Sequence, residues 1–278
     1  MTRPKKSLGQ NFLIDQNLIN KICEIVEIKG KNILEIGPGT GNLTTTILSK
    51  NPKRYIAVEK DRELIKPLNE KFGKKIKIIN QDILELNEKL LDNEILTVYG
   101  NLPYNISTEI LCKWILNIKD ENFWFDYLIL MFQKEVADRI ISVYNSKNYG
   151  RLTILSNWRL DIKKICDVKP SSFYPRPKID STILVFKPKK QFFKLKDPKN
   201  LEKITRTFFM HRRKMIKKPL NQLFSGHPKI VSNLKIDLNL RPQNLDLNTN
   251  RTRIFSGLIV LNFALKIVLA LQALQGLI

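Results

Sequence analysis

The stretch Asn32-Ile33-Leu34-Glu35-Ile36-Gly37-Pro38-Gly39-Thr40-Gly41 decides which fold this sequence predicts. Its first half is a short apolar run, typical of a buried strand, and its second half is a glycine-rich loop. A helix is expected to follow through about residue 50. The three elements form a nucleotide-binding βα unit, because glycines permit a tight turn and a close approach of the backbone to a ligand.

The glycine loop alone is a weak signal, since Asn42 stands where the dinucleotide fingerprint G-x-G-x-x-G requires Gly. The next two strands add to it. Strand 54–58 leads into Glu59, which lies 22 residues after Gly37, the distance at which an acid meets ribose hydroxyls in such folds. Strand 76–80 leads to Asp82, which could accept from an adenine amino group. Either acid alone could be a helix N-cap or a solvated loop charge; their order along the chain favours a ligand site.

A fourth strand, residues 95–99, leads into Gly100-Asn101-Leu102-Pro103-Tyr104-Asn105-Ile106-Ser107. In open α/β sheets, ligands bind beyond the carboxyl ends of the strands, which is where this segment falls. It offers hydrogen-bond acceptors, a rigid turn and a flat ring, a set that suits a planar base bearing an amino group. Ser107 and Thr108 are expected to cap the following helix.

The remaining strands are expected at 127–132, 162–168 and 181–186, with a helix from 133 to about 143. Residues 170–178 contain three prolines and predict an extended loop. Its aromatics, Phe173 and Tyr174, are either packing anchors or base-stacking groups.

The N-terminal arm, residues 3–12, is basic and ends in two amides, Gln10 and Asn11. One interpretation makes it the approach to a helix that covers the sheet, with Asp15 as the N-cap. The other lets the amides reach a ligand and the basic residues touch phosphate.

The charge balance points to a polyanionic partner. The 278 residues include 48 Lys and Arg against 26 Asp and Glu, a net charge of +22, which favours nucleic acid first and an anionic membrane second. Cys23, Cys112 and Cys166 form neither a disulfide framework nor a metal-ligand spacing, and with only two histidines we expect no metal site. The N-terminus has no apolar core of signal-peptide length, so we expect a cytoplasmic protein.

The composition changes near residue 187. Residues 187–218 hold 13 Lys and Arg but only two acids, and they include the cluster Arg212-Arg213-Lys214. A solvated helix face would normally intersperse acids, so a phosphate-contacting surface is favoured. We expect a catalytic domain at 1–187 and a small helical RNA-binding domain at 188–278.

The last 25 residues, 254–278, contain one charge, Lys266. That length could span a bilayer. However, Asn262, Lys266, Gln272 and Gly276 fall on one side of a helical wheel. We therefore expect a helix docked on the small domain and no membrane span.

Several segments follow one another in a specific order. They are Gly9-Gln10-Asn11-Phe12-Leu13, residues 35–41, Glu59, Gln81-Asp82, residues 100–107, Gln133-Lys134-Glu135-Val136, Tyr149-Gly150-Arg151-Leu152, Pro170-Ser171-Ser172-Phe173 and residues 175–181. With these segments the chain closely resembles the bacterial ribosomal small-subunit adenine N6-dimethyltransferases, the KsgA/RsmA family, over about residues 5 to 250.

The resemblance implies an α/β fold of the class I S-adenosylmethionine-dependent methyltransferases, Rossmann-like with a seven-stranded sheet, and a small α-helical C-terminal domain. It implies a monomeric enzyme that dimethylates N6 of two adjacent adenosines near the 3′ end of 16S rRNA in the small ribosomal subunit, with a role in subunit biogenesis. The implied cofactor contacts are Asn11, Leu13, Gly37, Glu59, Asp82 and Asn101.

An exocyclic adenine amine is a poor nucleophile, because its lone pair is delocalised into the ring. Acceptors for its hydrogens favour a more tetrahedral nitrogen, and the candidates are the side-chain oxygen of Asn101 and the carbonyl of Leu102. Pro103 would fix the turn, and Tyr104, with Phe173, would stack on the ring. No strong general base is needed, which fits the absence of a nearby His.

Two other functions remain open from the sequence. The nearer one is the related 23S rRNA adenine dimethyltransferase of the macrolide-resistance type, which shares the glycine loop and an Asn-x-Pro-Tyr core. The other is a mainly non-catalytic ribosome-assembly factor. A small-molecule methyltransferase would leave the charge of +22 unexplained.

Overall fold

The computed structural model describes residues 4–87, 94–118, 122–192, 194–195, 197–226, 228–233 and 237–244. The chain divides into two compact units. The first comprises residues up to 114, 118–137 and 161–188; the second comprises 115–117, 138–160 and the chain from 189. The last of these divisions falls between 188 and 189, and the boundary that we expect from the composition lies after 187. Nothing in the sequence pattern indicated that residues 138–160 belong with the second unit.

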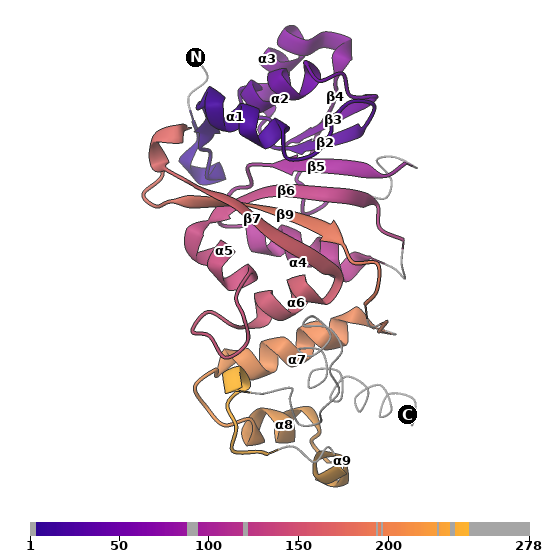
Figure 1. Ribbon diagram of the computed structural model, residues 1–278, viewed down its shortest axis with the longest axis vertical. Helices are drawn as coiled ribbons and strands as arrows, with labels where there is room; N and C mark the ends of the chain where they lie inside the picture. Colours follow the sequence, from indigo (N-terminus) through magenta and orange to yellow (C-terminus); the bar gives the residue numbers. More distant parts are fainter. Residues whose placement is uncertain are drawn as a thin grey trace. The chain divides into compact units, whose positions relative to one another are not determined.

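The first unit is built on a seven-stranded sheet with the strand order β4-β3-β2-β5-β6-β9-β7 (Figure 1). The strands are β2 (Asn32–Ile36), β3 (Arg54–Glu59), β4 (Lys77–Asn80), β5 (Leu96–Gly100), β6 (Phe125–Gln133), β7 (Leu160–Val168) and β9 (Ser181–Pro188). The pairs from β4 to β6 are parallel, and β9 runs antiparallel to β6. All seven predicted strands are confirmed, as is the Rossmann-like fold class.

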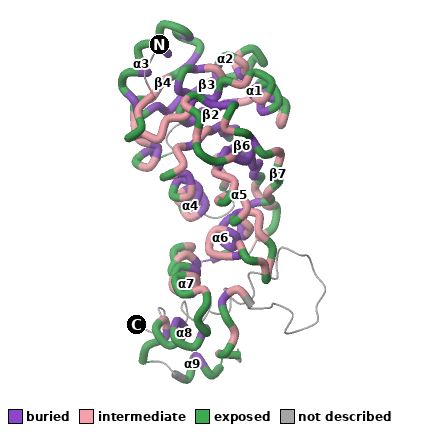
Figure 2. The backbone as a smooth tube through the Cα atoms, turned by 90° about the vertical axis from the view of Figure 1, so that its left-hand side faces the viewer, coloured by how far each residue is buried: buried purple, intermediate pink, exposed green. Residues whose placement is uncertain are grey.

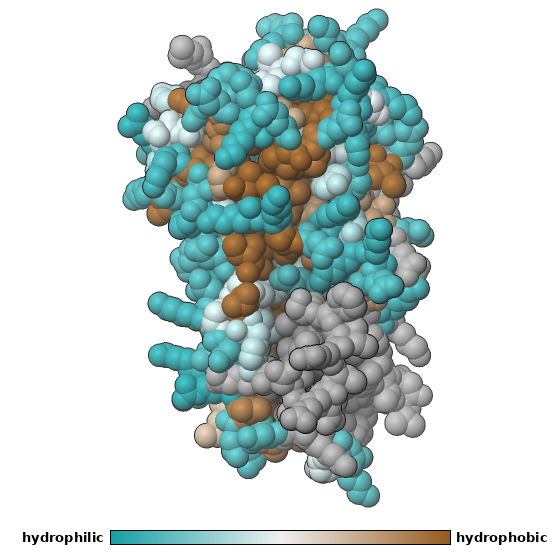
Figure 3. All heavy atoms as spheres, in the orientation of Figure 1, coloured by the Kyte–Doolittle hydropathy of each residue, from teal (hydrophilic) through white to brown (hydrophobic). Residues whose placement is uncertain are grey.

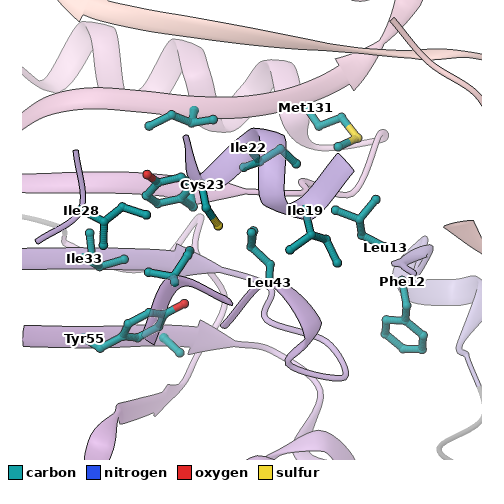
Figure 4. Packing of buried hydrophobic residues seen from close by; sticks show 14 of the residues in the cluster. Phe12, Leu13, Ile19, Ile22, Cys23, Ile28, Ile33, Leu43, Tyr55 and Met131 are labelled. Atoms are coloured by element: carbon teal, nitrogen blue, oxygen red, sulfur yellow. The ribbon is translucent and has the colours of Figure 1, made fainter. Parts of the chain in front are cut away.

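The central strands are continuous apolar runs because both of their faces are buried. Successive side chains of a strand point to opposite faces, so Ile33 and Leu34 of β2 enter different sides of the core, and both are fully buried. Ile33 belongs to a large cluster with residues of α1 (Gln16–Cys23), α2 (Asn42–Leu48) and α3 (Arg62–Phe72). Figure 4 shows Ile19, Ile22 and Cys23 of α1 lying against the strands.

Two further helices accompany the sheet, α4 (Ser107–Asn117) and α5 (Lys134–Ile140). In Figure 1, α1 lies in front of the strands and α4 lies behind β7 and β9. On the face seen in Figure 3, hydrophobic residues remain at the surface around α1 and the strands next to it. The partly buried Leu18, Tyr127 and Ile165 pack against the cluster.

The predicted helix caps have mixed outcomes. Asp15 is confirmed as the N-cap of α1, because its Oδ1 accepts from the amide of Leu18 at 3.1 Å. The capping expected of Ser107 is wrong: α4 begins at Ser107 itself, after Ile106 as N-cap with no side-chain cap hydrogen bond. The Ser107 hydroxyl instead donates to the carbonyl of Tyr104 at 3.1 Å, which fixes the turn before the helix.

The N-terminal arm forms elements that the sequence did not indicate. After η1 (Lys6–Leu8), β1 (Phe12–Leu13) pairs antiparallel with β8 (Phe173–Tyr174). The expected extended loop at 170–178 therefore contains η4 (Pro170–Ser172) and a short strand. Elsewhere in the first unit, another short helical turn, η2 (Gly73–Lys75), follows α3.

The second unit is helical. It contains α6 (Arg151–Arg159), α7 (Pro198–Met210), α8 (Lys217–Leu223), α9 (Pro228–Asn233) and η5 (Pro242–Asn244). Helical structure was expected after residue 187, and the first helix there is α7, which buries Leu201, Ile204 and Phe208. Helix α6 was not predicted. Figure 2 shows α6 with more buried and half-buried positions than α8 and α9, which are exposed along much of their length.

No helix among the described residues is long and apolar enough to cross a membrane. The helix expected at 254–278 lies outside the described residues. Cys23 and Cys112 are buried, Cys166 is partly buried, and all three are free thiols. Within the described ranges, no group of His, Cys, Asp and Glu has the arrangement of a metal site.

Candidate active site

One pocket in the first unit lies at the carboxyl ends of four neighbouring parallel strands. It is lined by residues 7–13 of the arm, 35–40 and 42–43 around the glycine loop, 58–60 after β3, 81–83 after β4 and 101–106 after β5. The sequence predicted six cofactor contacts, and all of them line this pocket: Asn11, Leu13, Gly37, Glu59, Asp82 and Asn101. Parallel strands bring Gly37, Glu59, Asp82 and Asn101 together, since their carboxyl ends meet at one sheet edge, and the N-terminal arm adds Asn11 and Leu13.

The glycine loop follows β2 in a left-handed backbone conformation. Gly37, Gly39 and Gly41 have φ values of 68°, 59° and 77°. Hydrogen bonds fix the loop, since the amide of Gly37 donates to Val58 at 2.9 Å and that of Gly41 donates to Pro38 at 2.9 Å. A Cβ atom on Gly37 would meet no heavy atom within 4 Å, so this part of the loop borders open space that a ligand can fill.

Glu59 ends β3 with a buried carboxylate, only 6% exposed. Burial raises the pKa of this carboxyl, against the effect of hydrogen bonds from backbone amides. The amide of Asp61 donates to Oε1 at 2.8 Å, and that of Gly39 donates to Oε2 at 3.3 Å. These bonds fix the carboxylate beside the glycine loop, where its remaining lone pairs can accept from a ligand hydroxyl.

Asp82 follows β4 and has a side chain that is 17% exposed. Burial acts to raise its pKa, but hydrogen bonds from Lys60 and from the amide of Leu84 outweigh it, and the net pKa is lowered. The Lys60 ammonium lies 2.6 Å from Oδ2. Asp82 is therefore an ionised acceptor at the pocket wall, paired with a flexible lysine.

The Asn101 side chain is oriented by the N-terminal arm. Its Nδ2 donates to the carbonyl of Asn11 at 2.7 Å. Within the described residues, no donor reaches the Asn101 Oδ1 or the carbonyl of Leu102, whereas the Pro103 carbonyl accepts from the amides of Ile106 and Ser107 at 3.1 and 3.0 Å. The Asn101 oxygen and the Leu102 carbonyl are thus left as acceptors, and both residues line the pocket.

Of the two predicted stacking aromatics, the structure brings one to the pocket. Tyr104 lines it, and the Tyr104 hydroxyl lies 2.6 Å from the Ser181 hydroxyl, which ties the ring to the start of β9. Phe173 does not line it. Its ring is 1% exposed and packs in the core cluster, with Phe173 opposite Leu13 in the β1–β8 pair. In this structure Phe173 is a packing anchor.

Gln10 and Asn11 both line the pocket, and the NH2 group of each is bound within the chain. Gln10 donates through Nε2 to Asp61 at 2.8 Å, and Asn11 donates through Nδ2 to the Gly9 carbonyl at 3.2 Å. Asp61 and Ser181 were not predicted as partners of site residues. The only local signal was their position, two residues after the end of β3 and at the start of β9.

Glu35, inside β2, is a second buried acid at the pocket. It is 2% exposed, and its Oε2 accepts from the hydroxyls of Thr44 and Tyr55, each at 2.5 Å. Burial nevertheless raises its pKa to about 7.

This raised pKa predicts a pH dependence of stability. Glu35 binds a proton more tightly in the folded chain than in the unfolded chain, so the free energy of unfolding falls as pH rises from about 4.5 to about 7. The shift corresponds to a loss of roughly 3 kcal/mol. Urea denaturation between pH 4.5 and 8 should show this decline in the wild type and a shallower one in Glu35→Gln, where the raised pKa of Glu59 still contributes.

Glu94 provides the control for this prediction. Hydrogen bonds from Lys53 and Asn32 lower its pKa, so Glu94→Gln should leave the decline in place. Equal slopes in the wild type and Glu35→Gln would contradict a buried Glu35 that titrates near neutral pH.

The cluster Arg212-Arg213-Lys214 lies in the second unit, directly after α7. Arg213 and Lys214 are exposed. Arg212 is half-buried: its Nε donates to Gln243 at 3.0 Å and its Nη2 donates to the Ser146 carbonyl at 2.9 Å. Two exposed cations are therefore available to a polyanion, while Arg212 joins segments of the second unit.

The fold and the pocket together define a class. The parallel sheet carries a glycine loop after β2, a buried acid at the end of β3 and a second acid after β4. This site has the donors and acceptors that fit an adenosyl group, with open space at Gly37 to receive it. The chain is a class I S-adenosylmethionine-dependent methyltransferase.

The comparisons narrow this class. A family model described as "Ribosomal RNA adenine dimethylase" matches residues 1–248. The chain is 64% identical over 244 residues to the Ribosomal RNA small subunit methyltransferase A of Pelagibacter ubique (strain HTCC1062), covering 88% of this chain and 93% of that protein. The chain belongs to the ribosomal RNA adenine dimethylase family.

Solved structures agree with this assignment. A dimethyladenosine transferase from Plasmodium falciparum superposes with a TM-score of 0.72 at 26% identity, covering 94% of this chain and 98% of that chain. The 23S rRNA methyltransferase ErmE superposes with a TM-score of 0.64 at 21% identity, covering 94% of this chain and all of that chain. At this identity the similarity shows a shared fold and no more.

Proposed function

We propose that this enzyme dimethylates N6 of two adjacent adenosines near the 3′ end of 16S rRNA in the small ribosomal subunit, using S-adenosylmethionine. The choice of substrate is supported by the 64% identity to the Ribosomal RNA small subunit methyltransferase A of Pelagibacter ubique. The chemistry is supported by the orientation of Asn101, whose Nδ2 is bound to the arm so that Oδ1 remains an acceptor at the pocket. We further propose that it acts as a cytoplasmic monomer and takes part in subunit biogenesis.

Asn101 and Leu102 would act on the target amine. Two acceptors that bind the two N6 hydrogens favour a more tetrahedral nitrogen with an available lone pair. When bound, S-adenosylmethionine supplies a methyl group whose sulfonium sulfur is a good leaving group without further activation. The residues therefore need mainly to position the amine in line with the bond between the methyl carbon and the sulfur. The transfer releases one N6 proton to water. After the first transfer, the N6 amine of the base has one N–H fewer. A neutral Asn side chain tolerates this change, so the second transfer can follow.

Tyr104 would stack on the target base, which has to leave its own stack to enter the pocket. Its anchored hydroxyl holds the ring in place without a ligand, so little side-chain freedom is lost on binding. A stacked base is worth ~1–3 kcal/mol. Our proposal that Phe173 completes the sandwich requires its ring to leave the core cluster. The basic surface would bind the RNA backbone.

The substrate is tested by incubating the protein with labelled S-adenosylmethionine and either undermethylated small subunits or large subunits. We expect N6,N6-dimethyladenosine at two adjacent positions of 16S rRNA. Label in 23S rRNA would support the large-subunit alternative, for which the likeness to ErmE offers only the fold. A catalytically inactive variant that still restored subunit maturation would show that an assembly role dominates.

Neutralising the exposed cations should weaken RNA binding and its dependence on salt. For Arg213→Ala with Lys214→Ala, we expect the slope of log affinity against log salt to fall by roughly 1 to 2, since each lost phosphate contact removes about 0.7–0.9. Small-subunit binding at a series of salt concentrations measures this slope, and cofactor affinity should not change.

Two further variants separate charge from folding. Lys66 is an exposed lysine of α3 in the first unit, with a side chain that is 87% exposed, and Lys66→Ala is the control for charge alone. Arg212→Ala should also lower the stability of the second unit, because it removes the bonds to Gln243 and Ser146. A loss of cofactor binding in the Arg213 and Lys214 variant would contradict this division of labour.

A further inference from the structure

We propose that Asp61 is a positioning residue for methyl transfer: it latches the N-terminal arm through Lys5 and Gln10, and the latched arm orients Asn101 through the carbonyl of Asn11. This inference rests on the proposed function, because it assigns the Asn101 oxygen to the target amine. The inference adds Asp61, which does not line the pocket, and it describes how Asp61 acts on Asn101, which does.

Asp61 lies at a junction of three parts of the first unit. Its carboxylate, 2% exposed, accepts from the Lys5 ammonium at 2.7 Å through Oδ1 and from the Gln10 amide at 2.8 Å through Oδ2. Oδ1 also accepts from the amide of Glu63 at 3.1 Å, which makes Asp61 the N-cap of α3. Its own amide donates to Glu59.

A helix N-cap needs only one of these oxygens. The second oxygen of Asp61 is committed to the arm alone, and the Lys5 ammonium adds a charge-assisted bond to the first. Lys5 also lies 3.0 Å from Glu63, so the arm is bound to the start of α3 at two acids. The contacts therefore hold the arm in one place and exceed what the helix requires.

The arm transmits this position to the pocket. The Lys5 amide donates to Gln10 Oε1 at 2.7 Å. This bond orients the Gln10 side-chain amide so that its NH2 group, and not its oxygen, points to Asp61. The next residue, Asn11, presents its carbonyl to Asn101 Nδ2 at 2.7 Å. Without that carbonyl, nothing in the described chain distinguishes the two ends of the Asn101 amide, and a turned amide would present NH2 to an amine.

The latch has a defined polarity that an exchange of groups can test. Gln10→Glu alone places two carboxylates face to face, and Asp61→Asn alone places two NH2 groups face to face. In the double variant Gln10→Glu with Asp61→Asn, the new amide donates to the new carboxylate, the Lys5 amide still has its acceptor, and the N-cap of α3 is kept.

Methyl transfer to undermethylated small subunits is measured at saturating cofactor and substrate. We expect each single variant to lower kcat by roughly 10- to 100-fold, as a misplaced reacting group does, and the double variant to recover most of the loss. Unchanged kcat in both single variants, an effect confined to cofactor affinity, or a double variant no better than the worse single one would each overturn the proposal.

Asp126→Asn is the matched control. Asp126 is also a lysine-paired aspartate of the first unit, bound to Lys31 and to the Thr97 hydroxyl near the amino ends of β5 and β6, away from the pocket. It should lower the thermal midpoint without lowering kcat. A fall in kcat as large as that of Asp61→Asn would show that Asp61 affects methyl transfer only through the overall stability of the protein.

Hydrogen exchange tests the latch without any substrate. The amides of Leu8, Gly9 and Gln10 donate within the arm, so each single variant should speed their exchange and the double variant should slow it again. Unchanged exchange in the single variants would refute the latch whatever the enzyme methylates. A wild type that labels no adenosine while exchange follows this pattern would instead refute the proposed function.

Discussion

Replacing Asn101 by alanine is expected to lower the rate of N6 methylation by roughly 100- to 1000-fold, the range seen when one preorganised polar group facing the reacting centre is removed. The variant loses the acceptor that Oδ1 offers to the amine, and it leaves the Asn11 carbonyl without its donor. Single-turnover transfer of labelled methyl groups to undermethylated small subunits measures the rate without product release.

Asn101→Asp separates two contributions of the same side chain. The carboxylate keeps an acceptor but cannot donate to Asn11, and its charge suits an amine with two N–H groups better than one with a single N–H. We expect the first methyl transfer to slow less than the second, so that monomethylated adenosine accumulates. Full dimethylation by Asn101→Ala at the wild-type rate would rule out the acceptor role.

Three of the site residues that the sequence identified share one physical property: they lie at or just after the ends of parallel strands. Glu59, Asp82 and Asn101 were found because buried strands are visible as apolar runs, and the carboxyl ends of such strands meet at one edge. Their partners follow no such rule. Asp61 meets Gln10 and Ser181 meets Tyr104 across long stretches of chain, so these contacts depend on how the arm and β9 pack.

The elements that were missed lack a sequence period. Helix α6 buries Thr153, Ile154, Leu155, Ser156, Trp158 and Arg159. These positions surround the helix, so no single apolar stripe marks it. The strands β1 and β8 have two residues each, too few to show an alternation.

Phe173 shows the limit of motif reading. An aromatic residue in a polar, proline-rich loop fits base stacking and packing equally well. The choice depends on the β1–β8 pairing, which places the ring in the core cluster next to Leu13.

Gly41→Ala is expected to lower the free energy of unfolding by roughly 2–5 kcal/mol, the sum of left-handed backbone strain and overpacking. The residue has a φ of 77°, and an added Cβ would lie 2.5 Å from Cε2 and 2.7 Å from Cζ of Phe72. Phe72 is 7% exposed in the core cluster, so its ring has little room to move away. Urea denaturation of the full chain measures the loss.

Gly30 provides the control that separates strain from crowding. Its φ of 71° is similar, but an added Cβ would meet no heavy atom within 4 Å. Gly30→Ala should therefore cost only the backbone strain, about 1–2 kcal/mol. Equal losses in the two variants would show that the Phe72 ring moves aside, so that crowding is not the reason for glycine at position 41. A larger loss in Gly41→Ala would instead show that the glycine loop depends on the packing of α3, because the Phe72 ring, held in the core, limits how closely the loop can lie against α3.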